Sequence, residues 1–148
     1  MNGLAELFSL IPLKPRGKAP LIGWAEFQSR RPTEEELTEW RCRWPDANWG
    51  IVTGMVSGVV VLDVDGETGR QSLKGRHIPP TWAVITGKGY HYYFEHPGFP
   101  VPNSASLEPG LDIRGDGGYV VAPGSIHPSG RRYEWAPGLS PEDVDLAS

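Results

Sequence analysis

Cysteine is almost missing from this sequence, which has only Cys42 among its 148 residues. A single cysteine forms no intramolecular disulfide and provides no thiolate cluster for a structural zinc ion. We therefore expect a protein of a reducing compartment whose fold uses no structural zinc.

Long hydrophobic runs are missing as well. No stretch reaches the roughly eighteen apolar residues that a membrane-spanning helix needs. The first ten residues, MNGLAELFSL, lack the basic region and the small-residue cleavage site of a signal peptide. These absences predict a soluble, cytoplasmic protein with no membrane partner.

Positive charge is also in short supply, because the formal net charge is −4. Phosphate contacts supply most of the non-specific affinity for nucleic acid, so a surface that is basic everywhere is excluded. Any contact with nucleic acid must then be local or lie partly outside this fragment. The length suits a single domain over residues 1–148, and the 19 glycines and 15 prolines predict many turns and short elements.

The spacing of apolar residues predicts a mixed α/β fold. Helices are expected at residues 2–9, 67–76 and 33–43, the last with Thr33 and Glu36 as a capping box. Strands, rich in Val, Ile and aromatic residues, are expected at 48–54, 57–66, 81–87, 90–96, 111–115, 118–124 and 131–136.

Three further segments complete this interpretation. The stretches 11–24 and 97–109 are rich in turn-forming residues and are predicted to be loops. Ser140 and Pro141 favour a helix that begins at the end of the sequence. We therefore expect this domain to be the N-terminal part of a larger protein.

Three aspartates and a histidine are the candidates for chemistry. Strand alternation puts Asp63 and Asp65 on one side, where two carboxylates repel each other unless a cation lies between them. Mg²⁺ and Mn²⁺ prefer such oxygen ligands, although a solvated strand end explains the pair equally well. Asp112 follows another apolar run and is either a third ligand or a turn residue. His91, in YHYYFEH, is either functional or structural.

Three linked motifs resemble the primase-polymerase branch of the archaeo-eukaryotic primase superfamily. They are VVVLDVDG, TGKGYHYYF and LDIRGDGGYVVAPGS, in the family's order and at its spacing. The resemblance implies an N-terminal α/β module packed on an antiparallel sheet like that of an RNA-recognition motif. It also implies a DNA primase or DNA polymerase, a nucleotidyltransferase that acts in phage or plasmid replication beside a helicase domain of the same protein.

The resemblance also assigns roles to individual residues. Asp63, Asp65 and Asp112 look like catalytic ligands of two Mg²⁺ or Mn²⁺ ions, and His91 looks like a contact to the phosphates of the incoming nucleoside triphosphate. Strand alternation predicts that Arg114 points to the same side as Asp112, where its guanidinium either holds a triphosphate or forms a surface salt bridge. Many relatives carry Ser where this chain has Gly89, so we expect the phosphate contact to come from backbone amides of residues 87–89 or from Lys88.

A single-stranded DNA template needs basic and aromatic contacts as well. The candidates are Lys14, Arg16, Lys18 and Trp24.

Two other interpretations stay open. A hydrophobic run followed by DVDG also resembles the nucleophile motif of haloacid-dehalogenase-like phosphatases, in which Asp63 would attack a phosphate. This chain has Glu67 where that family has Thr, however, and it leaves little room for a parallel sheet. The third interpretation is a module that binds a nucleotide or DNA without turnover.

Overall fold

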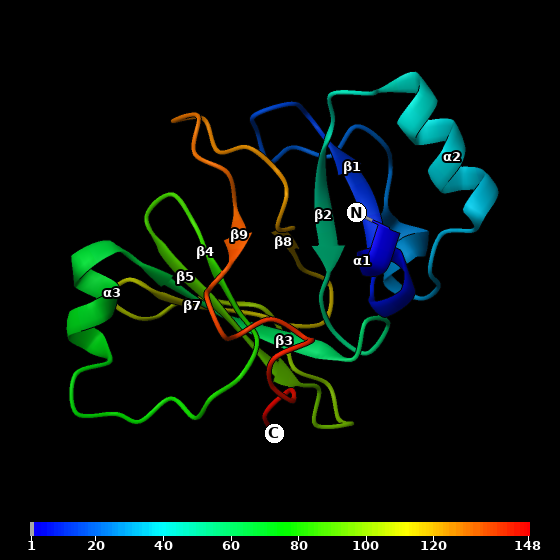
Figure 1. Ribbon diagram of the computed structural model, residues 1–148. Coiled ribbons are helices and arrows are strands. Elements are labelled where there is room, and N and C mark those ends of the chain that lie inside the picture. The colour runs from blue at the N-terminus through cyan, green and yellow to red at the C-terminus, as the bar shows by residue number, and fades with distance from the viewer. Residues whose placement is uncertain (1) are drawn as a thin grey trace.

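The chain forms two antiparallel β-sheets that share one hydrophobic core (Figure 1). The computed structural model describes residues 2–148, apart from the side chains of Asn2 and Ser106. In chain order the elements are α1 (Asn2–Leu7), β1 (Ser9–Leu13), the 3₁₀ helix η1 (Ala25–Gln28), α2 (Glu34–Arg43), β2 (Asn48–Val52), β3 (Val59–Asp65), α3 (Gly66–Ser72), β4 (Ala83–Ile85), β5 (Gly89–Glu95), β6 (Ser104–Glu108), β7 (Leu111–Arg114), β8 (Tyr119–Val121) and β9 (Glu134–Trp135).

The small sheet has the order β1-β2-β8 and is covered by α2 (Figure 1). Trp40 of α2 packs edge-on against Phe27 of η1, with ring centroids 5.2 Å apart, and also lies against Trp49 of β2. The helix begins at the predicted capping box, in which the Thr33 hydroxyl accepts from the Glu36 N–H and the Glu36 carboxylate accepts from the Thr33 N–H. The N-terminal α/β module is therefore built around buried aromatic contacts.

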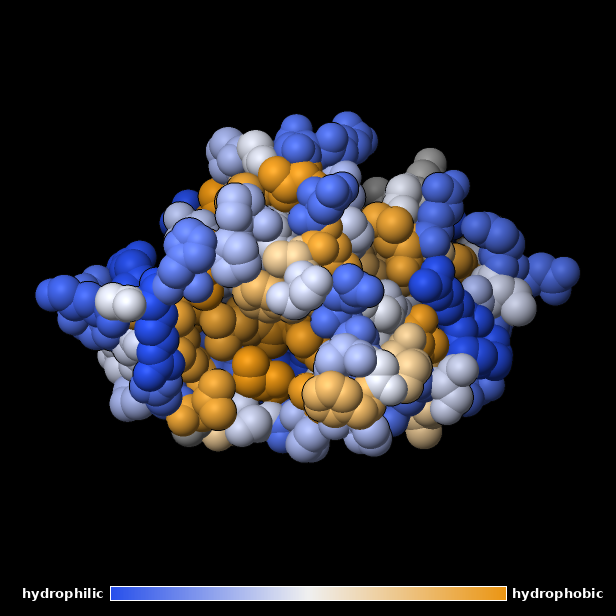
Figure 2. Space-filling view, turned by 90° about the horizontal axis from the view of Figure 1, so that it is seen from below, coloured by the Kyte–Doolittle hydropathy of each residue, from blue (hydrophilic) through white to orange (hydrophobic). Residues whose placement is uncertain are grey.

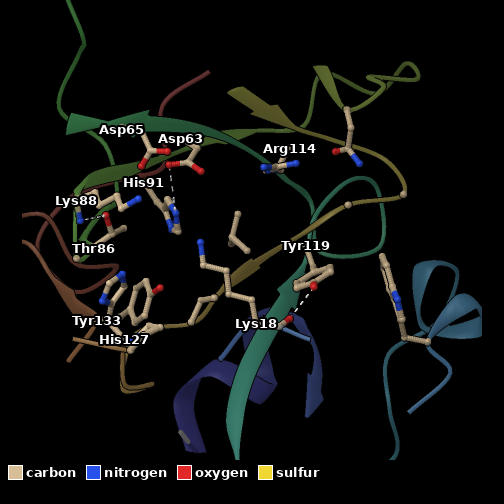
Figure 3. A pocket seen from close by; sticks show the side chains of 18 residues that line it. Lys18, Asp63, Asp65, Thr86, Lys88, His91, Arg114, Tyr119, His127 and Tyr133 are labelled. Atoms are coloured by element: carbon tan, nitrogen blue, oxygen red, sulfur yellow. Dashed lines mark hydrogen bonds and ion pairs between the residues drawn. The ribbon is translucent and has the colours of Figure 1, made fainter. Parts of the chain in front are cut away.

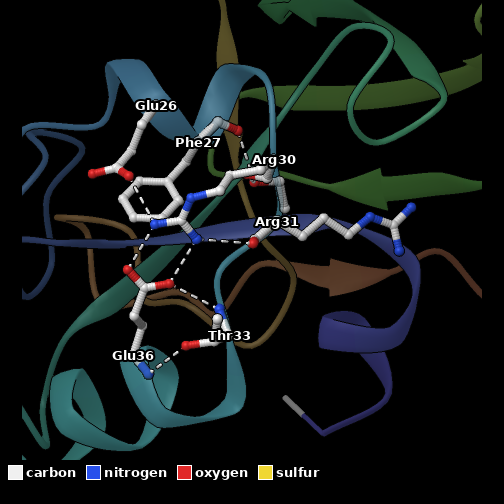
Figure 4. Close-up of polar contacts among 7 residues, drawn as sticks. Glu26, Phe27, Arg30, Arg31, Thr33 and Glu36 are labelled. Atoms are coloured by element: carbon white, nitrogen blue, oxygen red, sulfur yellow. Dashed lines mark hydrogen bonds and ion pairs between the residues drawn. The ribbon is translucent and has the colours of Figure 1, made fainter.

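Arg30 ties η1 to α2 on the outside of this module (Figure 4). Its guanidinium lies 2.7 Å from Glu26 and 2.8 Å from Glu36, and it stacks over the Phe27 ring. The hydrogen bond from Arg30, followed by one from the Thr33 backbone, lowers the pKa of Glu36 to about 2. This cluster joins surface elements and lies outside the cleft described below.

The large sheet has the order β6-β7-β3-β5-β4-β9, with every pair antiparallel. The chain passes from β3 through α3 to β4, leaving the space between these two strands for β5, as in a split β-α-β unit. The predicted hairpin of β4 and β5 is present, with Ile85 opposite Tyr90. The mixed α/β class and the antiparallel sheet expected from the resemblance are thus confirmed.

Aromatic side chains join the two sheets into one core. The Phe8 ring, just before β1, lies 6.0 Å from Tyr93 of β5 and 6.1 Å from Trp82. The chain also crosses between the sheets after β7, because β8 pairs with β2 of the small sheet. The two modules therefore cannot be separated without exposing Phe8 and Tyr93, both of which are buried.

Several predicted elements are wrong. Residues 9–13 form strand β1 rather than helix and loop, and part of the loop predicted at 97–109 forms β6. The strands at 48–54 and 57–66 are not neighbours in one sheet, since β2 and β3 belong to different sheets.

The predicted C-terminal helix is not formed. Residues 141–144 make a turn, after which the Ala147 N–H donates to Thr81 and the Ala147 carbonyl accepts from Glu95. These contacts at the large sheet hold the end of the chain extended.

The two faces of the large sheet differ in chemistry. Strand alternation turns Asp63 and His91 to the face beneath the small sheet, whereas Leu62 and Tyr92 lie on the other face. Figure 2, seen from below, shows apolar side chains gathered in a hollow on the underside of the molecule. Among residues 2–148, no helix is both long enough and apolar enough to cross a bilayer.

Candidate active site

A cleft of about 500 Å³ opens between the two sheets. Its charged lining consists of the carboxylates of Asp63 and Asp65 and the cationic side chains of Lys18, Lys88 and Arg114 (Figure 3). Three cationic side chains therefore face one cleft in a chain whose net charge is −4, and such local positive charge attracts anions.

Pairing in the large sheet brings the predicted residues together. Asp63 in β3 lies directly opposite His91 in β5 and, on its other side, opposite Asp112 in β7. Asp65 lies two residues further along β3 and therefore projects from the same face. It occupies the N-cap position of α3, yet its carboxylate makes no capping hydrogen bond. The carboxylate instead lines the cleft.

The surroundings of Asp63 disfavour the charged form of its carboxyl group. Its side chain is 18% exposed. Burial and the nearby charges of Asp65 and Asp112 raise its pKa to about 6, against the opposing influence of Arg114 and Lys18. Burial is the largest of these influences, so the surroundings of Asp63 disfavour its charged form.

His91 is buried beside this carboxylate. Its Nε2 lies 3.6 Å from Asp63 Oδ1, and its Nδ1 has no hydrogen-bond partner in the described part of the chain. Burial, together with the positive charges of Lys18 and Arg114, lowers the pKa of His91 to about 3. The imidazole is therefore neutral, and one of its buried ring nitrogens is left unsatisfied by the residues that the structure describes.

Asp112 shares its part of the sheet with Arg114. The Arg114 guanidinium approaches the Asp112 carboxylate at 3.3 Å. No group of three or more His, Cys, Asp and Glu side chains within the described residues is arranged as a metal cage. The strands thus place Asp63 and Asp112 in register, as the predicted cluster requires. The Asp112 carboxylate, however, contacts the Arg114 guanidinium.

The family comparison agrees with this geometry. The family model for Prim-Pol, described as bifunctional DNA primase/polymerase, N-terminal, matches residues 3–147. The chain belongs to this family. A comparison with curated proteins found no match. Family membership means DNA primase or polymerase activity in general, with nucleotides and DNA as substrates, and the antiparallel sheet gives no support to the phosphatase alternative.

In the turn before β5 of this prim-pol domain, two backbone amides form hydrogen bonds within the turn itself. The Thr86 hydroxyl accepts from the N–H groups of Lys88 and Gly89, at 3.3 and 2.9 Å. A Cβ at Gly89 would lie 1.9 Å from the Val64 carbonyl oxygen, so this glycine lets β5 approach β3. Packing thus explains Gly89, and its amide is occupied rather than free for a phosphate. The Lys88 side chain lines the cleft, and its phosphate contact stays a prediction.

The opposite wall comes from the N-terminal module and β8. The Tyr119 hydroxyl donates to the Lys18 carbonyl at 2.7 Å, and the Trp24 ring packs edge-on against Tyr119 at 5.1 Å. The charge of Lys18 reaches Asp63 and His91, whose pKa values it lowers. Of the four predicted template contacts, Lys18 and Trp24 line the cleft, whereas Lys14 and Arg16 do not.

The sequence analysis did not identify Tyr133 and His127, two residues that line the prim-pol cleft. Tyr133 lies between two imidazoles, with its ring 6.4 Å from His91 and 5.9 Å from His127. Burial, and then the charges of Asp63 and Asp65, raise the pKa of Tyr133. The only signal for His127 in the sequence was its place two residues after the third motif, which ends at Ser125.

Buried Asn48 holds two walls of the cleft together. Its amide group donates to the carbonyls of Gly17 and Ile126, at 3.0 and 2.8 Å, and its carbonyl oxygen accepts from the Ile126 N–H. Gly17 precedes Lys18 and Ile126 precedes His127, so one side chain at the start of β2 positions both cleft residues.

Proposed function

We propose that this prim-pol domain adds nucleotides to a 3′-hydroxyl under the direction of a single-stranded DNA template, with Mg²⁺ or Mn²⁺ held by Asp63, Asp65 and Asp112. One observation carries the proposal. Asp63 is paired in register with both His91 and Asp112, so three residues from three motifs meet at one point of the sheet.

The donor set fits a divalent cation. Burial and the neighbouring carboxylates raise the pKa of Asp63, and a bound cation would favour its charged form instead. Carboxylate oxygens are the ligands that Mg²⁺ and Mn²⁺ prefer. For Asp112, a ligand role means exchanging its contact with Arg114 for one with an ion. When bound, two such ions would lower the pKa of the attacking hydroxyl and neutralise charge on the pyrophosphate.

The protein's own side chains orient the triphosphate. Lys18, Lys88 and Arg114 provide positive charge around the cleft. Arg114 suits two oxygens of one phosphate, because a guanidinium donates two parallel hydrogen bonds. His91 also lines the cleft, and its imidazole gives the incoming phosphate a further polar contact. The new bond then joins the 3′-oxygen to the α-phosphorus, and the bond to pyrophosphate breaks.

The aromatic end of the cleft suits a base or the template. Trp24 and Tyr119 stand at the wall formed by the N-terminal module, and aromatic rings stack bases without reading their sequence. From the family resemblance alone, we place this activity in the replication of a phage or plasmid, with a helicase domain of the same protein as a partner.

Primer extension with Mn²⁺ or Mg²⁺ on a primed single-stranded template tests the proposal. We expect incorporation by the unaltered domain and a loss of at least about a hundredfold in Asp63→Asn, since the variant removes a charged ligand while keeping the shape. Glu95→Gln is the matched control, because Glu95 is exposed at the far end of β5.

Calorimetry with a deoxynucleoside triphosphate separates the alternatives. Metal-dependent binding with no incorporation would favour a module that binds without turnover. Steady release of inorganic phosphate would favour the phosphatase. Either result would overturn the proposed polymerase activity of this domain.

A further inference from the structure

His127 lines the cleft, and in its neutral form it carries its proton on Nε2, the nitrogen beside Gly87. Its Nδ1 accepts from the Ser129 N–H at 3.0 Å and lies 2.8 Å from the Ser129 hydroxyl. Because a backbone N–H can only donate, Nδ1 is the acceptor nitrogen, and in the neutral ring the proton therefore sits on Nε2. None of the hydrogen bonds in the described part of the chain uses Nε2.

The backbone holds this imidazole in one place. The His127 N–H donates to the Arg131 carbonyl, and its own carbonyl accepts from Gly130. The preceding residue, Ile126, is held from both sides by Asn48. Tyr133 packs against the ring from the β9 side. His127 is therefore a donor fixed in position.

The ring edge that carries Nε2 lies against the turn before β5. A Cβ built on Gly87 would lie 2.5 Å from Nε2 and from Cδ2, so only glycine leaves room for the imidazole here. Figure 3 shows His127 and Tyr133 on the opposite side of the cleft from Asp63 and Asp65. Nε2 is thus placed beside Thr86 and Lys88, where the amides of the turn are already used.

We propose that His127 is a nucleotide-binding residue, whose Nε2–H donates to a phosphate oxygen of the incoming nucleoside triphosphate. This inference rests on the proposed function and assigns it a second imidazole contact beside His91. Lys18 and Lys88 line the same cleft, so the acceptor that suits this position is an anionic oxygen. Tyr133 lies near both rings, with its centroid 6.4 Å from His91 and 5.9 Å from His127.

Two variants of His127 separate a hydrogen bond from packing. His127→Phe keeps a ring against Tyr133 but has no donor, whereas His127→Gln carries an amide N–H at a similar reach. We measure binding of dATP and of deoxyadenosine in Mn²⁺ by calorimetry, together with the thermal midpoint of each protein. For dATP we expect about a tenfold loss in His127→Phe, the effect of one hydrogen bond to a charged group, and substantial recovery in His127→Gln.

Binding of deoxyadenosine, which has no phosphates, tests whether His127 contacts the triphosphate part of the ligand. Its affinity, where measurable, should be the same in the unaltered protein and in His127→Phe. Equal dATP affinity in the unaltered protein and His127→Phe would overturn this inference alone. Equal losses in both variants with lowered thermal midpoints would assign His127 a structural role and overturn it too. No dATP binding by the unaltered protein would overturn the proposed function itself, and this inference with it.

Discussion

Asp63 and His91 face each other in register, with Nε2 of the imidazole 3.6 Å from Oδ1 of the carboxylate. Burial is the main cause of both pKa shifts, raising the pKa of Asp63 to about 6 and lowering that of His91 to about 3. At neutral pH the contact therefore places an uncharged ring beside a carboxylate whose charged form is disfavoured by its surroundings.

Asp63→Asn is expected to stabilise the metal-free protein at neutral pH. The folded-state pKa of Asp63, about 6, lies above its ordinary value of 3.8, so folding favours the protonated form. This contribution to stability is present below pH 4 and is lost as the pH rises to 6 and beyond. The variant removes the charge, and we expect it to gain about 2 kcal/mol at pH 7.5 and little at pH 4.

Urea unfolding at the two pH values, with a chelator present, measures this difference. Titration of His91 contributes to both proteins, so the comparison isolates Asp63. Glu95→Gln, at the exposed end of β5, should show no such pH-dependent gain. A variant with the same stability as the unaltered protein at pH 7.5 would mean that Asp63 is not strained by its surroundings.

Gly89→Ala should destabilise the pairing of β3 with β5. Its Cβ would lie 1.9 Å from the Val64 carbonyl oxygen, which is backbone and cannot turn away. We expect a loss of about 3 kcal/mol or more in the free energy of unfolding. Gly23→Ala is the matched control, because nothing lies within 4 Å of a Cβ there. Equal midpoints in thermal unfolding would contradict the close approach.

Lys18→Met should weaken the binding of a deoxynucleoside triphosphate by about three- to tenfold, as expected for one lost contact to phosphate. The residual affinity should also depend less on salt. Lys14→Met is the control, since Lys14 lies on the same loop but does not line the cleft. Calorimetry at two salt concentrations measures both effects. Similar losses in the two variants would point to general attraction rather than a contact in the cleft.

Asn48→Ala should be strongly destabilising. The side chain is 3% exposed, and three backbone groups of Gly17 and Ile126 would lose their hydrogen bonds. A loss of about 2–4 kcal/mol is expected, because these groups become unsatisfied. Asn103→Ala removes one hydrogen bond from an exposed residue and should lose about 1 kcal/mol or less. A loss in Asn48→Ala no larger than that in Asn103→Ala, measured by urea unfolding, would refute the role of Asn48.

The carboxylate site was largely visible in the sequence because strand alternation is local. A period of two fixes the side on which Asp63, Asp65 and His91 project once their strands are recognised. The opposite wall depends on contacts between residues far apart in the chain. The charge of Lys18 acts on Asp63 from the loop after β1, and no local pattern predicts that His127 would pack against Gly87.

The misplaced elements have physical reasons as well. β1 contains Pro12, which a central strand excludes but an edge strand such as β1 tolerates. β6, with the polar sequence SASLE, is also an edge strand, and its partner β7 determines its conformation. At the C-terminus, pairing of Ala147 with Glu95 and Thr81 outweighs the helix signal of Ser140 and Pro141.

The return of β8 to the small sheet has a consequence for synthesis of the chain. β1 and β2 lie within the first 52 residues, but their third strand ends at Val121. During translation, the first 52 residues therefore leave the ribosome with one edge of β2 unpaired, and β8 is complete only after nearly seventy further residues. A nascent chain halted before Tyr119 should expose that edge to chaperones or to other chains.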